Sequence, residues 1–404
     1  MRLALIALLV GSFVLTSLGA CSDAPELDPA APATASLRPG DRAVPADSGA
    51  LAPRLTTDAD GRPVLSWVEP TADGHRLRAA TWTGDGWAAP TTAAEGADWF
   101  VNWADTPGVI PTAGGALAHT LTRFPGGESP YAYDIRVGPA GGESRLLHDD
   151  GRAAEHGFVS AVALPDGRAG LVWLDGRNQA GGGHGHDAGA MTLRWAALAP
   201  DGTKTDEAEL DAQVCDCCPT TAVATASGVV VAYRDRTDAE IRDIAVVRRV
   251  DGAWTEPVVP HADGWEIAGC PVNGPALAAR DDRVALAWYT AADSARVRLA
   301  LSDDGGATWG PAVDLAQAPL GRVDVAFLDD GRAAVSWLEG SGDTAELRLR
   351  TVTPDGALGE SRTVATVPSG RASGVPHIAA LGDRLLAAWT DPDAGLIRSA
   401  VVSP

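Results

Sequence analysis

The stretch that decides the fold is residues 283–315, RVALAWYTAADSARVRLALSDDGGATWGPAVDL. An apolar run over 284–288, an alternating run over 296–301 and a third apolar run after a glycine-rich turn predict successive antiparallel strands. In that turn, Asp304 can bond the turn backbone, glycines supply positive φ, and Trp309 can close the hairpin with an apolar side chain. The stretch therefore contains most of one small sheet.

Similar segments recur about every 54 residues along the chain. Their shared feature is an apolar run that ends in an aromatic residue, at Trp67, Trp173, Tyr233, Trp288, Trp337 and Trp389, and a weaker copy around His119 fills the one large gap. Asp-Gly turns before and after these runs predict a four-stranded meander in each copy. We therefore predict an all-β propeller of seven blades, with six as the alternative, and expect residues 35–46 to complete the last blade.

The beginning of the chain predicts export and a lipid anchor. An apolar run over 3–15 is followed by Leu18-Gly19-Ala20-Cys21, which predicts a signal peptide over 1–20. The ending resembles the bacterial lipobox, which implies lipidation of Cys21 and, with Ser22 after it, an outer-membrane lipoprotein that faces the periplasm or the surface. Residues 21–45 are rich in Ala and Pro and are expected to be a tether. The propeller is then assigned to residues 46–404.

Charge limits the partners that we expect. The formal net charge is −21 at pH 7 and no Lys/Arg cluster occurs, which argues against nucleic acid and against an anionic membrane surface. We expect a monomer that meets the membrane through its lipid and binds an acidic glycan or a protein partner.

The most specific local signal is a group of four cysteines. Cys215, Cys217 and Cys218 open the fourth repeat and Cys270 opens the fifth, so neighbouring blades should bring them together. In an exported protein the first expectation is two disulfides, with Cys215–Cys218 and Cys217–Cys270 as the least strained pairing. The alternatives are a soft metal, zinc or copper(I), and thiol redox chemistry. His184 and His186, in a glycine-rich turn, are candidate additional metal ligands.

Further polar residues fall at the starts of blades or just after the aromatic runs, which in a propeller lie at the same end of the ring. Singly, each is more often a solvated loop charge or a structural ion pair. We take the following as candidate residues for binding at this rim: Asp235, Arg236, Asn273, Tyr289 and His377.

The turn at 302–309 matches S-x-D-x-G-x-T-W and resembles the Asp-box of sialidase-like (BNR-repeat) β-propellers. The string Val231-Ala232-Tyr233-Arg234-Asp235-Arg236 looks like that of exported bacterial members. In sialidases three arginines grip the substrate carboxylate, a tyrosine is the nucleophile and an aspartate is the acid and base. Arg54 partly matches the motif of the first arginine, and the candidates by rim position for the other two are Arg234 or Arg236 and Arg322. The candidate tyrosine is Tyr233 or Tyr289, and the candidate acid is Asp105 or Asp235. The family's nucleophilic tyrosine follows its last arginine, whereas the four tyrosines here lie at or before Tyr289.

Two functional hypotheses follow. The first is a membrane-anchored propeller that binds a ligand, metal or partner at a Cys- and Arg-rich rim. The alternative is an exo-sialidase-type glycoside hydrolase that acts on an acidic sugar. We favour the first because the enzyme hypothesis rests on analogy of fold.

Overall fold

The computed structural model describes residues 40–179 and 189–404. Within them the chain forms seven antiparallel sheets of four strands each. Cys21, His184 and His186 lie outside the described residues. No helix of the described residues is long and apolar enough to cross a membrane.

Each sheet is one blade. In six of the seven sheets the strands follow each other in chain order from the axis outward, and in the seventh the outermost strand is β1. The innermost strands are β2 (Leu51–Thr57), β6 (Gly108–Thr112), β10 (His156–Ala163), β14 (Thr221–Thr225), β18 (Ala276–Arg280), β22 (Pro319–Phe327) and β26 (His377–Leu381). The second strands are β3 (Pro63–Thr71), β7 (Gly115–Arg123), β11 (Ala169–Asp175), β15 (Gly228–Arg234), β19 (Arg283–Thr290), β23 (Ala333–Ser341) and β27 (Arg384–Asp391).

The third strands are β4 (Gly74–Thr81), β8 (Tyr133–Pro139), β12 (Met191–Leu198), β16 (Ile244–Val250), β20 (Arg296–Ser302), β24 (Thr344–Val352) and β28 (Leu396–Val402). The outermost strands are β5 (Thr91–Gly96), β9 (Arg145–Leu146), β13 (Lys204–Val214), β17 (Ala253–Trp254), β21 (Val313–Gln317), β25 (Arg362–Pro368) and β1 (Asp41–Arg42). A short 3₁₀ turn, η2 (Arg371–Ser373), precedes β26.

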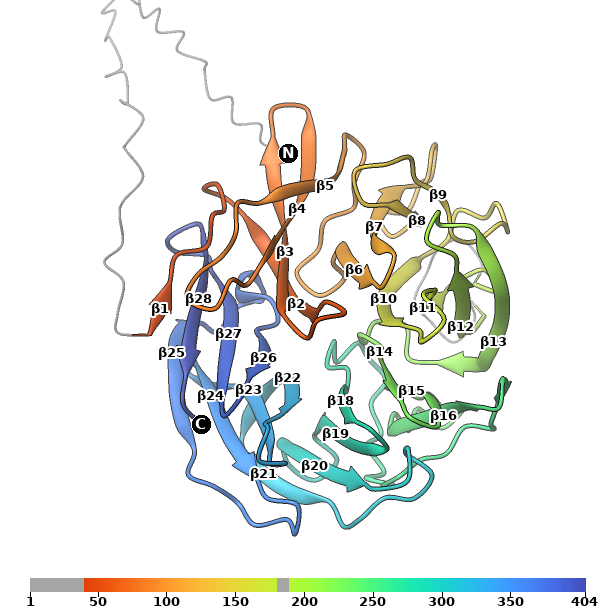
Figure 1. The fold of residues 1–404 in the computed structure, drawn as a ribbon. Coiled ribbons are helices and arrows are strands. Elements are labelled where there is room, and N and C mark those ends of the chain that lie inside the picture. The colour runs from red at the N-terminus through yellow and green to blue at the C-terminus, as the bar shows by residue number, and fades with distance from the viewer. Residues whose placement is uncertain (1–39, 180–188) are drawn as a thin grey trace, which may run out of the picture. The chain divides into compact units, whose positions relative to one another are not determined.

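The seven sheets form a closed ring. Each innermost strand contacts the innermost strand of the next blade, and β26 contacts β2 (Figure 1). The predicted seven-bladed propeller is therefore confirmed, and the six-bladed alternative is wrong. We call the end of the ring where the innermost strands begin and the second strands end the upper rim.

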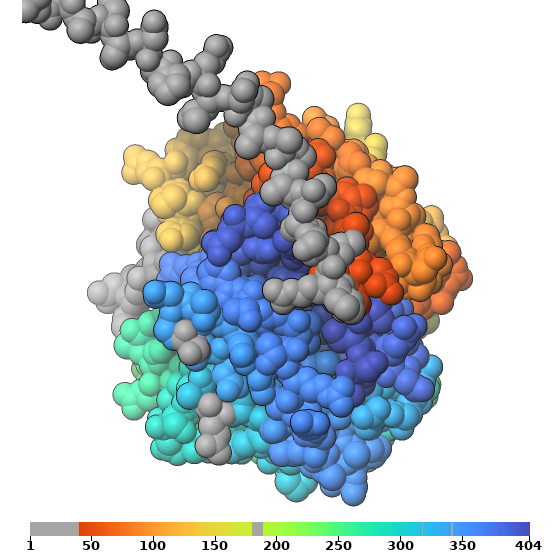
Figure 2. Space-filling view, turned by 90° about the vertical axis from the view of Figure 1, so that its left-hand side faces the viewer, coloured from red at the N-terminus to blue at the C-terminus, as the bar shows by residue number. Residues whose placement is uncertain are grey.

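The ring closes where strands from the two ends of the chain share one sheet. Strand β1 pairs with β28, with Asp41 opposite Ala400 and Arg42 opposite Ser399. Figure 2 shows the C-terminal strands, in dark blue, beside the N-terminal strands, in red and orange. The outer strand of the last blade thus comes from the segment 35–46, as predicted, and the propeller begins before residue 46.

The Asp-box turn has the geometry that its residues predict. Asp304 accepts hydrogen bonds from the backbone N–H and the hydroxyl of Thr308, at 2.8 and 2.6 Å. Gly305 and Gly306 have φ of 67° and 77°, and Trp309 packs into the apolar cluster between the fourth and fifth blades. The turn therefore closes a hairpin and helps to join two blades.

Three innermost strands contain a β-bulge near the upper rim. The register shifts in β2, β10 and β22, and Ala52, Phe158 and Arg322 there have φ of 56°, 53° and 56°. A left-handed conformation costs free energy in residues with a side chain, and such strain is often found beside binding sites. All three bulges face the axis of the ring.

Candidate functional site

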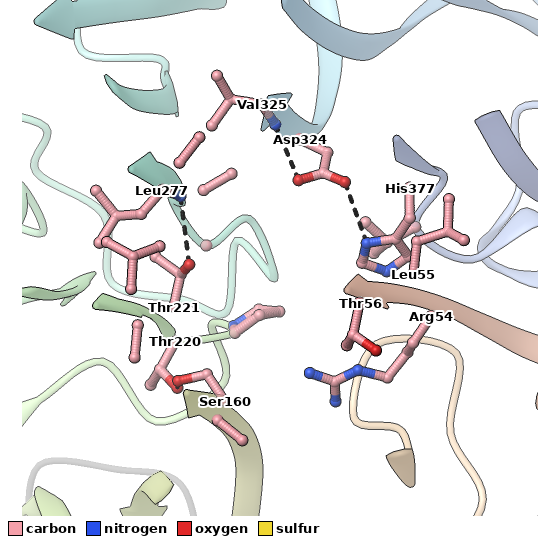
Figure 3. A pocket seen from close by; sticks show the side chains of 18 of the residues that line it. Arg54, Leu55, Thr56, Ser160, Thr220, Thr221, Leu277, Asp324, Val325 and His377 are labelled. Atoms are coloured by element: carbon pink, nitrogen blue, oxygen red, sulfur yellow. Dashed lines mark hydrogen bonds and ion pairs between the residues drawn. The ribbon is translucent and has the colours of Figure 1, made fainter. Parts of the chain in front are cut away.

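A cavity of about 690 Å³ lies on the axis of the ring, and residues from the innermost strands of all seven blades line it. Its size falls in the range of small-molecule sites. Figure 3 shows Arg54, Asp324 and His377 around it on different blades. Five of the residues predicted from the sequence are brought together in its lining, namely Arg54, Asp105, Asn273, Arg322 and His377.

Arg54 is held by the main chain of the second and third blades. Its guanidinium donates to the carbonyl oxygens of Thr106 and Val159, each at 3.1 Å. Burial lowers the pKa of Arg54, while the charges of Asp105 and Asp324 act in the opposite direction. The guanidinium N–H groups of Arg54, which were predicted to bind a substrate carboxylate, therefore donate to the main chain of neighbouring blades.

Asp105 lies in a buried group with Glu155 and Tyr133. The sequence did not predict Tyr133 as a site residue. The phenol of Tyr133 donates to Asp105 at 2.6 Å and lies 3.0 Å from a Glu155 oxygen. Asp105 also accepts the backbone N–H of Phe158 at 2.8 Å. Burial raises the pKa of Asp105 to about 6, although these hydrogen bonds and the charge of Arg54 lower it. Burial, together with Asp105 and Glu155, raises the pKa of Tyr133 well above its usual value, so this phenol stays protonated.

Gly157 explains how the side chains of Asp105 and Tyr133 can lie so close to the main chain of β10. A Cβ at Gly157 would lie 1.9 Å from Oδ2 of Asp105 and 2.7 Å from the Tyr133 oxygen. Only glycine leaves room for the two side chains to meet beneath the backbone. No periodicity in the sequence marks this approach, which is why Tyr133 was not predicted.

Arg322 and Arg234 also bind main-chain oxygens. Arg322 donates to the carbonyls of Gly370 and Gly374, each at 3.0 Å, and its guanidinium lies 4.7 Å from the Trp103 ring. Its pKa is lowered to about 10 by burial and by the nearby charge of Arg371.

Arg234 lies outside the lining of the cavity and fastens the fourth blade to the fifth. It donates to the carbonyl oxygens of Asn273, Arg242 and Tyr289 at 2.6–3.0 Å, and it stacks 4.7 Å from the ring of Trp265. The three predicted carboxylate-binding arginines therefore have structural partners.

The remaining predicted residues are spread over the rim. Tyr233 donates its phenol to Asp211 at 2.5 Å, and burial raises its pKa. The pKa of Asp235 is raised to about 6, chiefly by burial. Tyr289 packs edge-on against Trp265, with ring centroids 5.5 Å apart.

At the axis, Asn273 and His377 bind neighbouring blades. Asn273 accepts the backbone N–H of Arg322 at 2.8 Å, and His377 lies 3.3 Å from a carboxylate oxygen of Asp324. Both side chains thus help to fix the start of β22.

Three of the predicted cysteines form a compact buried group on the upper rim. Cys215, Cys217 and Cys218 are 0%, 6% and 1% exposed, in the loop from β13 to β14. The Sγ atom of Cys215 lies 4.0 Å from that of Cys217 and 3.5 Å from that of Cys218. The backbone N–H of Cys215 donates to Arg234 O at 3.0 Å, which ties this loop to the end of β15. We call Cys215, Cys217 and Cys218 the thiol cluster.

Positive charge stabilises a thiolate in the cluster. Arg242 donates to the Sγ atom of Cys215 at 3.2 Å, and Glu240 holds Arg242 at 2.6 Å. Burial raises the pKa of Cys215, but hydrogen bonding with Cys217 and Cys218 and the charge of Arg242 outweigh it, and the pKa falls well below its usual value. The thiolate is the form that binds metals and attacks electrophiles.

Cys270 brings a fourth thiol from the fifth blade. Cys270 is exposed, and a hydrogen bond with Cys217 lowers the pKa of its thiol. The predicted meeting of the four cysteines on neighbouring blades is thus present. All four are free thiols in the structure, so the predicted disulfide pairing stays a prediction.

A network of charged side chains beside the thiols was also missed from the sequence. Arg236, a predicted rim residue, binds Asp216 at 3.2 Å and Glu240 at 2.7 Å. Arg242 and Glu240 follow β15 by only a few residues. Their alternating charges in the stretch 236–243 were the one available signal, but nothing in the sequence showed that they would be buried.

Comparisons with known proteins bear on the fold. No family model matches the chain, and no curated protein matches it. Among solved structures, polysaccharide lyase Uly1 has a TM-score of 0.54 at 9% identity, with 92% of this chain and 94% of that chain covered. The NanB sialidase of Streptococcus pneumoniae has a TM-score of 0.46 at 12% identity, covering 92% and 71%. A Penicillium chrysogenum α-L-arabinanase has 0.49 at 14%, covering 90% and 98%.

These likenesses concern architecture. The chain has a propeller fold like that of polysaccharide lyase Uly1. At such low identities a shared fold carries no statement about substrate or chemistry. The function must therefore be argued from the side chains of this protein.

Proposed function

We propose that this protein binds a soft metal ion, zinc(II) or copper(I), through the thiol cluster on its upper rim. The observation that carries the proposal is the convergence of three buried sulfur atoms, with Sγ separations of 3.5 and 4.0 Å around Cys215. Four sulfurs bound tetrahedrally at about 2.3 Å from zinc are about 3.8 Å apart. The thiol cluster therefore has the spacing of a ligand set.

The surroundings supply the remaining requirements of such a site. Thiolates must be deprotonated to bind a metal, and Arg242 favours the thiolate of Cys215. Three thiolates around a divalent ion leave one excess negative charge, and the guanidinium of Arg242, which is also bound by Glu240, lies beside it. Cys270 hydrogen-bonds Cys217 and is exposed, so it offers a fourth sulfur and a route from solvent.

A disulfide between Cys215 and Cys218 is a weaker explanation for the closeness of these two residues. A disulfide stabilises a protein mainly by closing a loop in the unfolded chain, and the loop between Cys215 and Cys218 is very short. Hydrolysis of an acidic sugar has less support still, since Arg54, Arg234 and Arg322 bind main-chain carbonyls. The lipid anchor at Cys21 stays a prediction from the sequence.

Elemental analysis tests the proposal directly. The protein is purified under reduction without oxygen, offered zinc or copper(I), desalted and measured for metal per chain and for free thiols. We expect one metal ion per chain, and a loss of affinity of more than about 100-fold in Cys215→Ser or Cys217→Ser. Cys21→Ser is the matched control, because it removes a cysteine outside the cluster, and should retain the metal.

Two results would refute metal binding. One is a reduced, folded protein that binds neither zinc nor copper(I). The other is an affinity that is the same in Cys215→Ser as in Cys21→Ser. Melting temperature gives a second readout, since a metal at 100 times its dissociation constant stabilises the folded state by about 2.7 kcal/mol.

A further inference from the structure

A second cluster of buried ligand-type side chains lies between the second and third blades, also at the upper rim. It contains Asp134, His148, Asp150, His156 and Asp175, and we call it the His–Asp cluster. The side chains of His156 and Asp175 are fully buried, and β-sheet register places these two residues opposite each other in β10 and β11. His148 and Asp150 reach them from the loop after β9.

The donor atoms of this cluster converge. The two oxygens of Asp150 lie 3.0 Å from Nδ1 of His148 and 3.0 Å from Nε2 of His156. The same Nε2 is 3.6 Å from Oδ1 of Asp175. Donors bound to one cation at about 2.1 Å are about 3.0 Å apart at right angles and about 3.4 Å apart in a tetrahedron. The observed separations match that spacing.

Neighbouring groups orient these donors as the second layer of a metal site does. Nδ1 of His156 lies 3.2 Å from the carbonyl oxygen of Tyr133, which turns Nε2 toward the carboxylates. Asp175 is fixed by the indole N–H of Trp173 at 2.8 Å and by Arg177 at 2.7 Å. Hydrogen bonds of this kind hold metal-binding imidazoles and carboxylates in place.

The charge in the cluster calls for a cation. Of the three carboxylates, Asp175 and Asp150 lie 2.7 Å and 3.6 Å from the guanidinium of Arg177, and Asp134 is also acted on by the charge of Arg136. The next arginine, Arg194, is 3.9 Å from Asp175 and is bound more closely by two glutamates. A buried excess of negative charge is costly unless it is paired. Protons on both imidazoles supply two positive charges, as many as one divalent metal ion, so the spacing of the donors carries the argument for a metal more than the charge does.

We propose that Asp150, His156 and Asp175, with His148 beside them, bind a divalent first-row metal ion at a site separate from the thiol cluster. Imidazole and carboxylate donors favour ions such as Mn²⁺, Fe²⁺ or Zn²⁺ over copper(I). Asp150 is the partly exposed member, so the ion enters from its side. The two clusters then bind different metals on one rim.

Manganese is the probe that separates the two sites, because thiolates are poor ligands for it. The full chain is titrated with Mn²⁺ under reduction, and the electron paramagnetic resonance signal of the free ion is followed. We expect one Mn²⁺ per chain. We also expect at least a tenfold weaker Mn²⁺ affinity in His148→Gln and Asp150→Asn, because changing the groups of a metal site typically weakens metal binding by at least about this factor. Cys218→Ser should bind Mn²⁺ as the unaltered protein does.

His261→Gln is the control for His148→Gln, since His261 is likewise stacked on an aromatic ring, while its ring nitrogen bonds the carbonyl oxygen of Gly310 and no carboxylate. Equal Mn²⁺ affinity in His148→Gln, Asp150→Asn and His261→Gln would overturn the proposal. So would a free-ion signal that the unaltered protein leaves undiminished, and this result decides the question even if the variants fail to fold. After either result, the His–Asp cluster is instead a hydrogen-bonded network, with protons on its imidazoles, that joins the second and third blades.

Discussion

Asp105 shows how burial changes the acid chemistry of a single residue. Its pKa is about 6 in the folded protein, against 3.8 for an ordinary aspartate, because burial outweighs its hydrogen bonds from Tyr133 and Phe158. A raised folded-state pKa means that the neutral acid stabilises the fold. This contribution is fully present below about pH 4 and is lost as the pH rises through about 6. The difference corresponds to about 3 kcal/mol.

Asp105→Asn should remove this pH dependence. The amide can accept the Phe158 N–H and donate to the Tyr133 oxygen, which keeps its own bond to Glu155. We expect the free energy of unfolding of the unaltered protein, relative to Asp105→Asn, to fall by about 3 kcal/mol from pH 4 to pH 7. Urea unfolding at several pH values measures it. A constant difference across this range would mean that Asp105 is already ionised at pH 4.

The sequence indicated where the candidate arginines lie in the ring, but it did not indicate which groups they bind. Arg54 and Arg322 were predicted at the rim, because blade order fixes where the start of each repeat lies, and both line the cavity on the axis. Their partners are main-chain oxygens that come from other blades, and such contacts leave no pattern in the sequence. Likewise Tyr133 sits in a third strand, where an aromatic residue is ordinary in a propeller core.

The second strand of each blade carries the most predictable packing. The sequence showed its terminal aromatic residue, but it did not show that a carboxylate two positions later accepts the indole N–H. Trp67 donates to Glu69 at 2.7 Å and Trp337 to Glu339 at 3.0 Å. Alternate residues share one face of a strand, so this pairing follows from β geometry once the strand is known. Glu69 and Glu339 are thus part of the blades rather than free rim charges.

Arg234, at the end of β15, gives a test of how elements are joined. Its guanidinium reaches three carbonyl oxygens of the fourth and fifth blades and stacks on Trp265. Lysine keeps the charge but has neither the planar fork nor the stacking surface. We expect Arg234→Lys to lower the free energy of unfolding by about 3 kcal/mol, because buried main-chain oxygens lose their donors.

Arg248→Lys is the control for that variant, because Arg248 makes one bond, at 2.8 Å, to the carbonyl oxygen of Gly305. It should cost less than about 1 kcal/mol. Equal losses in the two variants, measured by urea unfolding, would show that Arg234 is not a special link between blades.

At the scale of the molecule, the ring explains why distant residues form local sites. Residues about 54 positions apart occupy equivalent places in adjacent blades, so Cys217 and Cys270 become neighbours across a blade boundary. The repeat made this juxtaposition predictable. The His–Asp cluster was not predicted, because His148 and Asp150 lie in a loop outside the repeated strands.

Closure of the ring by β1 is the feature on which the last blade depends. Gly40 O accepts the N–H of Val401 at 2.8 Å, and Arg42 O accepts the Ser399 hydroxyl at 2.9 Å. A chain that starts at Val44 lacks these bonds and exposes the edge of β28, whereas one that starts at Arg38 keeps them. Losing two to three such bonds costs about 2–3 kcal/mol, or about 3 °C in melting temperature for a chain of this size. Calorimetry of the two chains should show this difference, together with more self-association of the shorter one through its open edge. Equal melting temperatures would mean that the blade is held by its inner strands alone.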